Sequence, residues 1–322
     1  MRGWHIRHRS ALAVAVFLTV LPGAPAGQTA PSGPFAIGVL RRDGIVVPFA
    51  NYDGKRWRTD WPEPREQVDV PIHVRDVPSR WWGKAGPLEN WQLWLGADSA
   101  PTVHVRQPEW FAAHCYRQIG LRTDYRPAQP PPGPAERPYP KDGLAVAPPH
   151  PIQPVEIVAP AAAPPPVVAA FNEAERKAIK EFERESTWSH PYKAPQRESL
   201  PVNVEAVYAA GDPAAARVYY FEVSREYRNP NAGTSECATA SYGAGWFVRD
   251  GSGPLRAIGI EAVLVDCDRY GVRYMLPLGV VHLDGRMFWI AQWSGWDYEE
   301  YDVVEIKRDK VDVAAHRWGG GC

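Results

Sequence analysis

The chain has 322 residues, and its 36 Lys and Arg against 37 Asp and Glu give a formal net charge of −1. This balance argues against nucleic acid as a partner, because such binding rests on clustered cationic contacts to phosphate. Removal of residues 1–26 would take away three arginines and no acid, so 36 less 3 leaves 33 basic against 37 acidic residues. The length that is left suits two domains better than one.

Residues 1–26 have the pattern of a removable secretory signal. Three arginines precede a short apolar run from Ala11 to Leu21, and Ala24-Pro25-Ala26 matches the small-x-small cleavage pattern. The apolar run is shorter than the roughly twenty residues that a membrane-spanning helix needs. We therefore expect an exported protein, periplasmic or secreted, whose mature chain has no transmembrane span.

Residues 34–125 predict a small antiparallel β module. Asp43-Gly44 and Asp53-Gly54 each separate apolar or aromatic runs, and Asp-Gly supplies the positive φ values that tight hairpin turns need. The module also holds seven tryptophans, each of which would bury about 150–250 Å². Because a small core cannot readily enclose them all, we expect an exposed group that includes Trp81 and Trp82. These two either pack on another part of the chain or form a partner or glycan surface.

Residues 126–168 are rich in proline and predict an extended linker. Proline fixes φ and lacks a backbone N–H, so this composition disfavours a helix or a central strand. Besides a plain solvated linker, three alternatives are open. The segment could be a spacer across an envelope layer or a ligand for a proline-binding partner. Alternatively, a short piece such as Val155–Val158 could dock as an edge strand.

Residues 169–322 predict one amphipathic helix followed by a second β module. Within residues 171–186, Asn172 and Glu175 have the spacing of a capping box, and apolar residues recur on one helical face. From about Pro201 onward, seven strands are predicted as a meander that curls into a sandwich or partial barrel. The predicted fold class is therefore mainly β: two small antiparallel modules joined by a proline-rich linker, with one helix before the second module.

Four cysteines, in an exported protein, suggest two disulfides. Cys237 and Cys267 are the nearest in sequence and flank a predicted hairpin, so we favour that bridge. Cys115–Cys322 would then tie the two modules together. No C-x-x-C motif is present and no two histidines of the mature chain stand at i,i+4, so we expect neither a metal site nor a cofactor.

The stretch WSGWDYEEYDVVEI, from Trp293 to Ile306, contains most of the candidate ligand-binding residues. These are Trp293, Trp296, Tyr298, Glu299 and Glu300. The preceding strand is apolar on both faces, which predicts that Trp289 lies in the core, whereas residues 294–300 form a connection. Aromatic rings there could stack on a sugar while neighbouring carboxylates accept hydroxyl hydrogen bonds. For Trp296 the pattern favours an inward ring that plugs the end of the sheet over a ligand platform.

The sequence leaves three functions open. We prefer a non-catalytic binding or envelope-associated protein that uses exposed aromatics, with a glycan or an envelope protein as its partner. The second is a glycan-active hydrolase with paired carboxylates, for which the candidates are Asp297, Glu299, Glu300 and Asp302, with Asp266 and Asp268 as possible neighbours. The third is a scaffold in which the proline-rich segment spaces two docking domains. The sequence has no G-x-S-x-G nucleophile motif, no P-loop and no dinucleotide-binding motif that would identify a reaction. It does not specify an oligomeric state.

Overall fold

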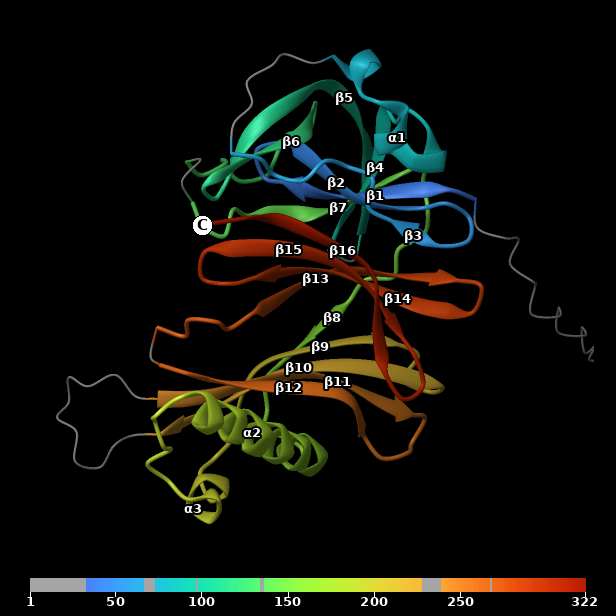
Figure 1. Cartoon of the computed structure of the whole chain (residues 1–322). Helices are drawn as coiled ribbons and strands as arrows, with labels where there is room; N and C mark the ends of the chain where they lie inside the picture. The colour runs from blue at the N-terminus through green and yellow to red at the C-terminus, as the bar shows by residue number, and fades with distance from the viewer. Residues whose placement is uncertain (1–32, 67–72, 97, 134–135, 228–238, 267) are drawn as a thin grey trace, which may run out of the picture. The chain divides into compact units, whose positions relative to one another are not determined.

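The computed structural model describes residues 33–66, 73–96, 98–133, 136–227, 239–266 and 268–322 (Figure 1). Contacts group the chain from Pro31 to Cys322 into one compact unit. Among the described residues, strands account for 52% and helices for 14%, which confirms the mainly β class. The strands form a closed six-stranded barrel and two further sheets, with antiparallel pairing throughout the described parts.

The barrel closes in the strand order β1–β7–β4–β5–β6–β2, and β1 pairs with β2 to complete the ring. Its strands are β1 Phe35–Arg41, β2 Ile45–Tyr52, β4 Asn90–Leu95, β5 Asp98–Ala113, β6 Tyr116–Thr123 and β7 Lys141–Ala147, with the short β3 Trp57–Arg58 beside β2. Between β3 and β4 lie the short helices η1 Val74–Asp76, α1 Ser79–Trp82 and η2 Gly83–Ala85. The predicted turn at Asp43-Gly44 joins β1 to β2, and Gly44 has the positive φ, 82°, that this turn requires.

Two strands come from the stretch that was predicted to be a linker. β7 lies between β1 and β4, so the expectation that residues 126–168 contain no central strand is wrong. The reason is local: its sequence KDGLAVA has no proline, and it can therefore donate to both neighbours. β8 (Glu156–Val158) pairs with β9 at the edge of the five-stranded sheet, which confirms the edge-strand alternative.

The remaining strands form two sheets that pack as a sandwich, as predicted for the second module. The five-stranded sheet has the order β12–β11–β10–β9–β8, with β9 Asn203–Gly211, β10 Ala216–Tyr227, β11 Thr239–Asp250 and β12 Arg256–Val265. The four-stranded sheet has the order β13–β14–β15–β16, with β13 Tyr274–Leu283, β14 Arg286–Ser294, β15 Tyr298–Ile306 and β16 Val311–Gly321.

The four-stranded sheet is buried on both faces, because it lies between the barrel and the five-stranded sheet (Figure 1). Phe288 and Ile290 of β14 pack in a cluster with barrel residues such as Val146. Trp289 faces the other way, and its ring meets that of Trp246 of β11 at 5.0 Å. Trp289 is fully buried, which confirms the prediction that it belongs to the core.

The predicted amphipathic helix is present as α2 (Pro165–Glu185), which packs on the outer face of the five-stranded sheet and is followed by α3 (Ala194–Glu198). α2 begins earlier than predicted, with Pro164 at its N-cap, because proline fits the first helical turn where its missing N–H is not needed. The capping-box prediction is therefore wrong. Asn172 and Glu175 lie inside the helix, and both contact Arg225 of β10.

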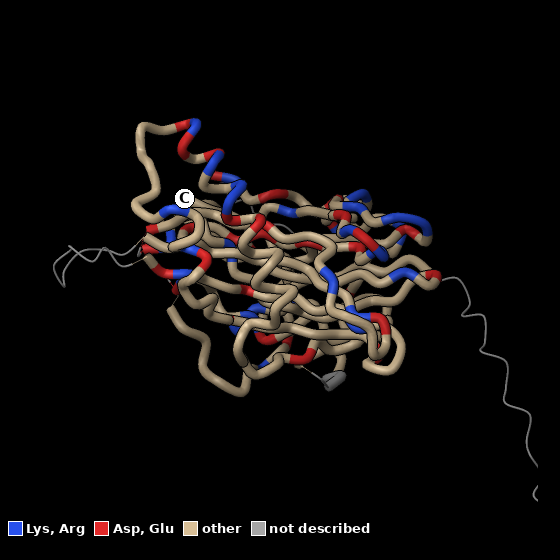
Figure 2. The backbone as a smooth tube through the Cα atoms, turned by 90° about the horizontal axis from the view of Figure 1, so that it is seen from below, with Lys and Arg blue, Asp and Glu red and all other residues tan. Residues whose placement is uncertain are grey.

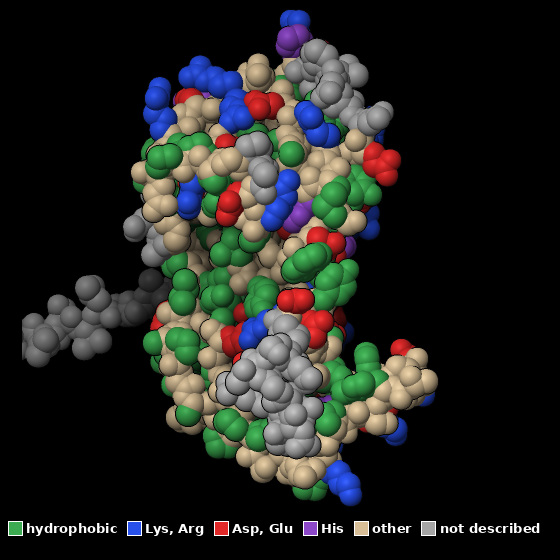
Figure 3. All heavy atoms as spheres, turned by 90° about the vertical axis from the view of Figure 1, so that its left-hand side faces the viewer, with side chains coloured by type: hydrophobic (Ala, Val, Ile, Leu, Met, Phe, Trp, Pro, Cys, Tyr) green, Lys and Arg blue, Asp and Glu red, His purple; other side chains and the backbone are tan. Residues whose placement is uncertain are grey.

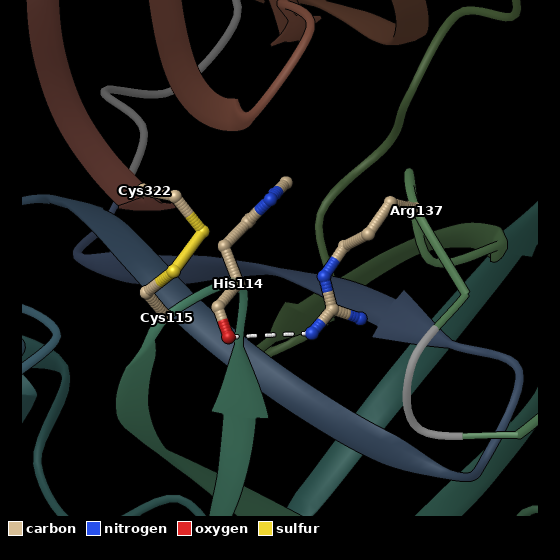
Figure 4. The surroundings of a disulfide bond; sticks show 4 residues. All are labelled: His114, Cys115, Arg137 and Cys322. Atoms are coloured by element: carbon tan, nitrogen blue, oxygen red, sulfur yellow. Dashed lines mark hydrogen bonds between the residues drawn. A yellow bond between two sulfur atoms is a disulfide. The ribbon is translucent and has the colours of Figure 1, made fainter.

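A disulfide joins Cys115, in the turn between β5 and β6, to Cys322 at the end of β16, with a Cα–Cα distance of 5.1 Å (Figure 4). Beside it, Arg137 donates a hydrogen bond to the His114 carbonyl oxygen at 3.3 Å. Cys237, Cys267 and the signal segment lie outside the described residues, so the second bridge and the signal stay predictions. Within the described part of the chain, no helix is long and apolar enough to cross a membrane.

Candidate functional site

A groove of about 390 Å³ opens between the two sheets of the sandwich, a size that suits a small-molecule or oligomeric ligand. One wall comes from β10, β11 and β12, and the other from β14, β15 and β16. Its aromatic lining is Tyr220, Tyr242, Trp246 and Trp293, and its charged lining is Glu261, Arg273 and Asp302. This is the inter-sheet groove.

Small residues among large ones create the space. On β11, Trp246, Ala244 and Tyr242 alternate onto the face that looks toward the four-stranded sheet. Ala244 stands in register between Glu222 of β10 and Glu261 of β12. This cross-strand row therefore has a carboxylate on each side of Ala244. Because Ala244 contributes only a methyl group, the groove is hollow at that position.

Trp293 is the main aromatic contribution of the four-stranded sheet to the groove. Its ring lies 5.6 Å from that of Tyr220, and the Arg273 guanidinium lies 5.2 Å from its centroid, a cation–π geometry. Trp293 is 8% exposed, and its buried Nε1–H finds no acceptor among the described residues. Buried donors are normally paired, so this indole can donate to a ligand in the groove.

The charged groups leave the groove with a negative balance. Arg273 is neutralised by Glu300, whose carboxylate lies 2.8 Å from its guanidinium. Asp302 is 4% exposed, and its Oδ1 lies 2.8 Å from Nδ1 of the half-exposed His316. Glu261 has no ion-pair partner in the described ranges. The groove therefore offers hydrogen-bond acceptors and would repel anionic ligands.

A buried carboxyl, Glu222, lies beside the groove on the same sheet face as Ala244. Burial raises its pKa to about 7, although the Met275 N–H donates a hydrogen bond to it at 2.7 Å and the Tyr242 hydroxyl donates another. Burial, together with the neighbouring Glu222, also raises the pKa of Tyr220 and of Tyr242 well above the ordinary value of 10. Both tyrosine hydroxyls therefore keep their protons at neutral pH and remain hydrogen-bond donors.

Trp296 is 67% exposed, so the prediction that it plugs the sheet is wrong. The connection between β14 and β15 is only residues 295–297, and it is closed by a hydrogen bond from Gly295 N–H to the Tyr298 carbonyl at 2.9 Å. The Tyr298 ring lies so close to Gly295 that an added Cβ would be 2.1 Å from it. Tyr298 therefore takes the inner position, and Trp296 contacts the exposed Tyr270 edge to face at 5.5 Å. Tyr270 directly precedes Gly271, which lines the groove.

The structure separates the residues that the sequence grouped as candidates. Trp293 and Glu300 stand opposite each other on the face toward the groove, and Tyr298 follows the same alternation. Glu299 points to the other face, where it is buried and pairs with Lys141 at 2.9 Å, so its role is structural.

Trp81 and Trp82 belong to α1 and not to an extended segment, and both rings pack against Trp61. Trp82 is 1% exposed, and Trp81 is half-buried beside the same barrel core. The barrel accommodates more tryptophans than expected because Trp57 packs outside its interior, against Phe288 of the four-stranded sheet.

Sequence reasoning missed the aromatic wall of the five-stranded sheet. The available signal was the alternation in VYYFEVSREY, which places Tyr220 and Glu222 on one face of β10. On the side of the molecule in Figure 3, hydrophobic side chains gather in a band between its two ends, next to acidic and basic groups. In the view of Figure 2, the two signs of charge are interspersed along the backbone.

In the described ranges, no three His, Cys, Asp or Glu side chains cluster closely enough to hold a metal ion. The chain matches no model of a known family, no curated protein and no solved structure. The chemistry of the site must therefore be inferred from its own geometry, which offers aromatic faces, acceptors and one unpaired indole donor.

Proposed function

We propose that this is an exported binding protein that holds a carbohydrate chain in the inter-sheet groove. One observation carries the proposal: aromatic rings from both sheets line a groove whose unneutralised polar groups are carboxylates. Sugars present apolar ring faces that stack on such aromatics and hydroxyl groups that donate to carboxylates. The exposed Trp296–Tyr270 pair beside the groove supports a binding role over a purely structural one.

Export is supported by two features. Residues 1–26 have the signal pattern described above, and the Cys115–Cys322 disulfide suits an oxidising compartment. Mass mapping of the purified protein under non-reducing conditions tests this part of the proposal. A mature chain that begins at Met1 with four free thiols would contradict it.

The binding role is tested with Trp296→Ala and Trp293→Phe. Trp296 is largely exposed, so its truncation should leave Tm nearly unchanged, since surface substitutions change stability by about 0.5 kcal/mol or less. Loss of an aromatic anchor typically costs more than about 1 kcal/mol of binding, or about fivefold in affinity. Trp293→Phe keeps a ring in the core while it removes the indole donor, and it should also weaken binding.

Retention on a glycan array measures both variants. Ile157→Ala is the matched control, because Ile157 is an exposed apolar residue of β8 that does not line the groove. If both tryptophan variants are retained as strongly as the wild type, the inter-sheet groove is not the binding site. A Trp296→Ala protein that unfolds would show that this ring is structural.

Hydrolysis of the bound chain is a second candidate, favoured by one observation. Glu261 and Asp302 line the same groove from facing sheets, and sheets in a sandwich pack about 10 Å apart. Glycoside hydrolysis needs two carboxyl groups on opposite sides of one bond. Chromatography of oligosaccharides after incubation with the protein decides: shorter products that disappear with Glu261→Gln support the enzyme, and intact oligosaccharides contradict it.

A further inference from the structure

A second hollow, of about 350 Å³, lies at the end of the four-stranded sheet. Its lining residues are Tyr116, Asp297, Tyr298, Glu300, Trp318, Gly321 and Cys322. All come from β15, β16 and the segments that flank them, except Tyr116, which belongs to β6 of the barrel. The rings of Tyr116 and Trp318 meet edge to face at 4.8 Å, so barrel and sheet build this wall together. This is the terminal hollow.

The terminal hollow continues the inter-sheet groove along one cross-strand row. Trp293 stands opposite Glu300, and Glu300 stands opposite Trp318. Directly opposed residues project from the same face of a sheet. Two strand spacings separate the two tryptophans, or roughly 10 Å between their Cα atoms, which is comparable with the length of a disaccharide.

The residue between the two tryptophans, Glu300, connects the two cavities through its ion pair. Glu300 lines the terminal hollow, and its ion-pair partner Arg273, at 2.8 Å, lines the groove. The pair is partly exposed, so it can exchange hydrogen bonds with a ligand that passes over it.

We propose that the terminal hollow is a second subsite for the chain that occupies the groove, which makes the ligand a linear, neutral oligosaccharide longer than a disaccharide. This inference rests on the proposed function. One sugar ring lies against Trp293, the next passes the Arg273–Glu300 pair, and a further ring lies against Trp318.

The charges of the terminal hollow specify a neutral chain. Arg273 balances Glu300, whereas the side chain of Asp297 has no cationic partner among the described residues. An unbalanced carboxylate accepts hydroxyl hydrogen bonds but repels the carboxylates of uronic acid polymers. The inter-sheet groove has the same sign of imbalance, through Glu261 and Asp302, so both subsites select against polyanions.

The disulfide holds one wall of the terminal hollow in place (Figure 4). Cys322 lines the hollow, and its N–H donates to the Asp297 carbonyl at 2.9 Å. The Cys115 N–H donates to the Gly321 carbonyl at 3.2 Å, and Tyr116 is the next residue. Reduction of this disulfide should therefore loosen the terminal hollow while it leaves the groove intact.

Isothermal titration calorimetry with oligomers of β-1,4-linked glucose and of β-1,4-linked N-acetylglucosamine, from disaccharide to hexasaccharide, tests the second subsite. Wild-type affinity should rise by about tenfold from disaccharide to tetrasaccharide, the effect of one further aromatic anchor. Trp318→Ala should abolish this rise while disaccharide affinity stays the same. Trp188→Ala is the matched control, because this half-buried tryptophan follows α2, lines neither cavity and should leave the rise unchanged.

If Trp318→Ala does not fold, as judged by its thermal unfolding, Tyr116→Ala removes the other ring of the same wall, which comes from a different element. Replacement of both cysteines, Cys115→Ser together with Cys322→Ser, supplies a third arm, in which the gain with chain length should fall and disaccharide affinity should hold. If the folded Trp318→Ala and Tyr116→Ala variants still show the rise in affinity from disaccharide to tetrasaccharide, the second subsite is refuted and the proposed function stands. Preference for oligogalacturonate would overturn the neutral-chain inference alone. Absence of binding by every oligosaccharide, or preference for a basic peptide, would overturn both.

Discussion

Replacement of Glu222 by Gln should remove a large part of the pH dependence of stability. Glu222 is 3% exposed, and burial raises its pKa from an ordinary 4.5 to about 7. At about 1.4 kcal/mol for each tenfold change in proton affinity, this difference corresponds to about 3 kcal/mol. The folded state holds the proton more tightly than the unfolded chain. The stability is therefore fully present below pH 4.5 and is lost as the pH rises through about 7.

Urea unfolding at pH 5 and pH 8 measures this effect. Between these values, the free energy of unfolding of the wild type should fall by about 2–3 kcal/mol more than that of Glu222→Gln. Gln keeps an acceptor for the Met275 N–H, so the variant should retain the fold. Glu226→Gln is the control, because Glu226 is an exposed carboxyl on the same strand. Parallel pH dependence in the wild type and Glu222→Gln would refute the reasoning.

Two further outcomes are expected. Arg225→Met should destabilise the protein by about 3–5 kcal/mol in urea unfolding, because it leaves Glu175 buried without its cation. Addition of Glu175→Leu should recover much of that loss, and a double variant no more stable than the single one would contradict this account. Ala244→Leu places a larger side chain in the inter-sheet groove and should lower oligosaccharide affinity at least about fivefold, or about 1 kcal/mol, without lowering Tm. Unchanged affinity in calorimetry would show that the ligand lies elsewhere.

The sequence predicts individual strands and the helix well because their signals are local. Alternation and Asp-Gly turns place β1 and β2, and a run that is apolar on both faces identifies β14 as a central strand. The barrel is different. It closes through β7, which pairs with β1 about a hundred residues earlier in the chain, and no periodicity within β7 indicates that partner. Its proline-rich surroundings concealed a short segment without proline.

The candidate site is harder to predict because its residues meet only after two sheets pack. Trp293 was identified from its aromatic neighbourhood, but Tyr242 and Trp246 face it from a different sheet. Composition cannot assign Glu299 and Glu300 to opposite faces until the register of β15 is known. Trp296 was misplaced for a similar reason: the neighbouring Tyr298 occupies the space beside Gly295 into which Trp296 was expected to turn.

Burial across the four-stranded sheet explains why binding should be concentrated at one end of it. The barrel packs on one face, and the five-stranded sheet covers the other around Trp289, which is fully buried. Along β14 and its neighbours the cover then decreases, from the nearly buried Trp293 to the half-buried Glu300 and Trp318. Trp318 lies beyond the part of the sheet that the five-stranded sheet covers, and it is only half-buried. The packing of the core therefore does not by itself require an aromatic residue there. A ligand that stacks on this residue would supply the missing cover, and the disulfide to the barrel keeps that end of the sheet rigid enough to bind it.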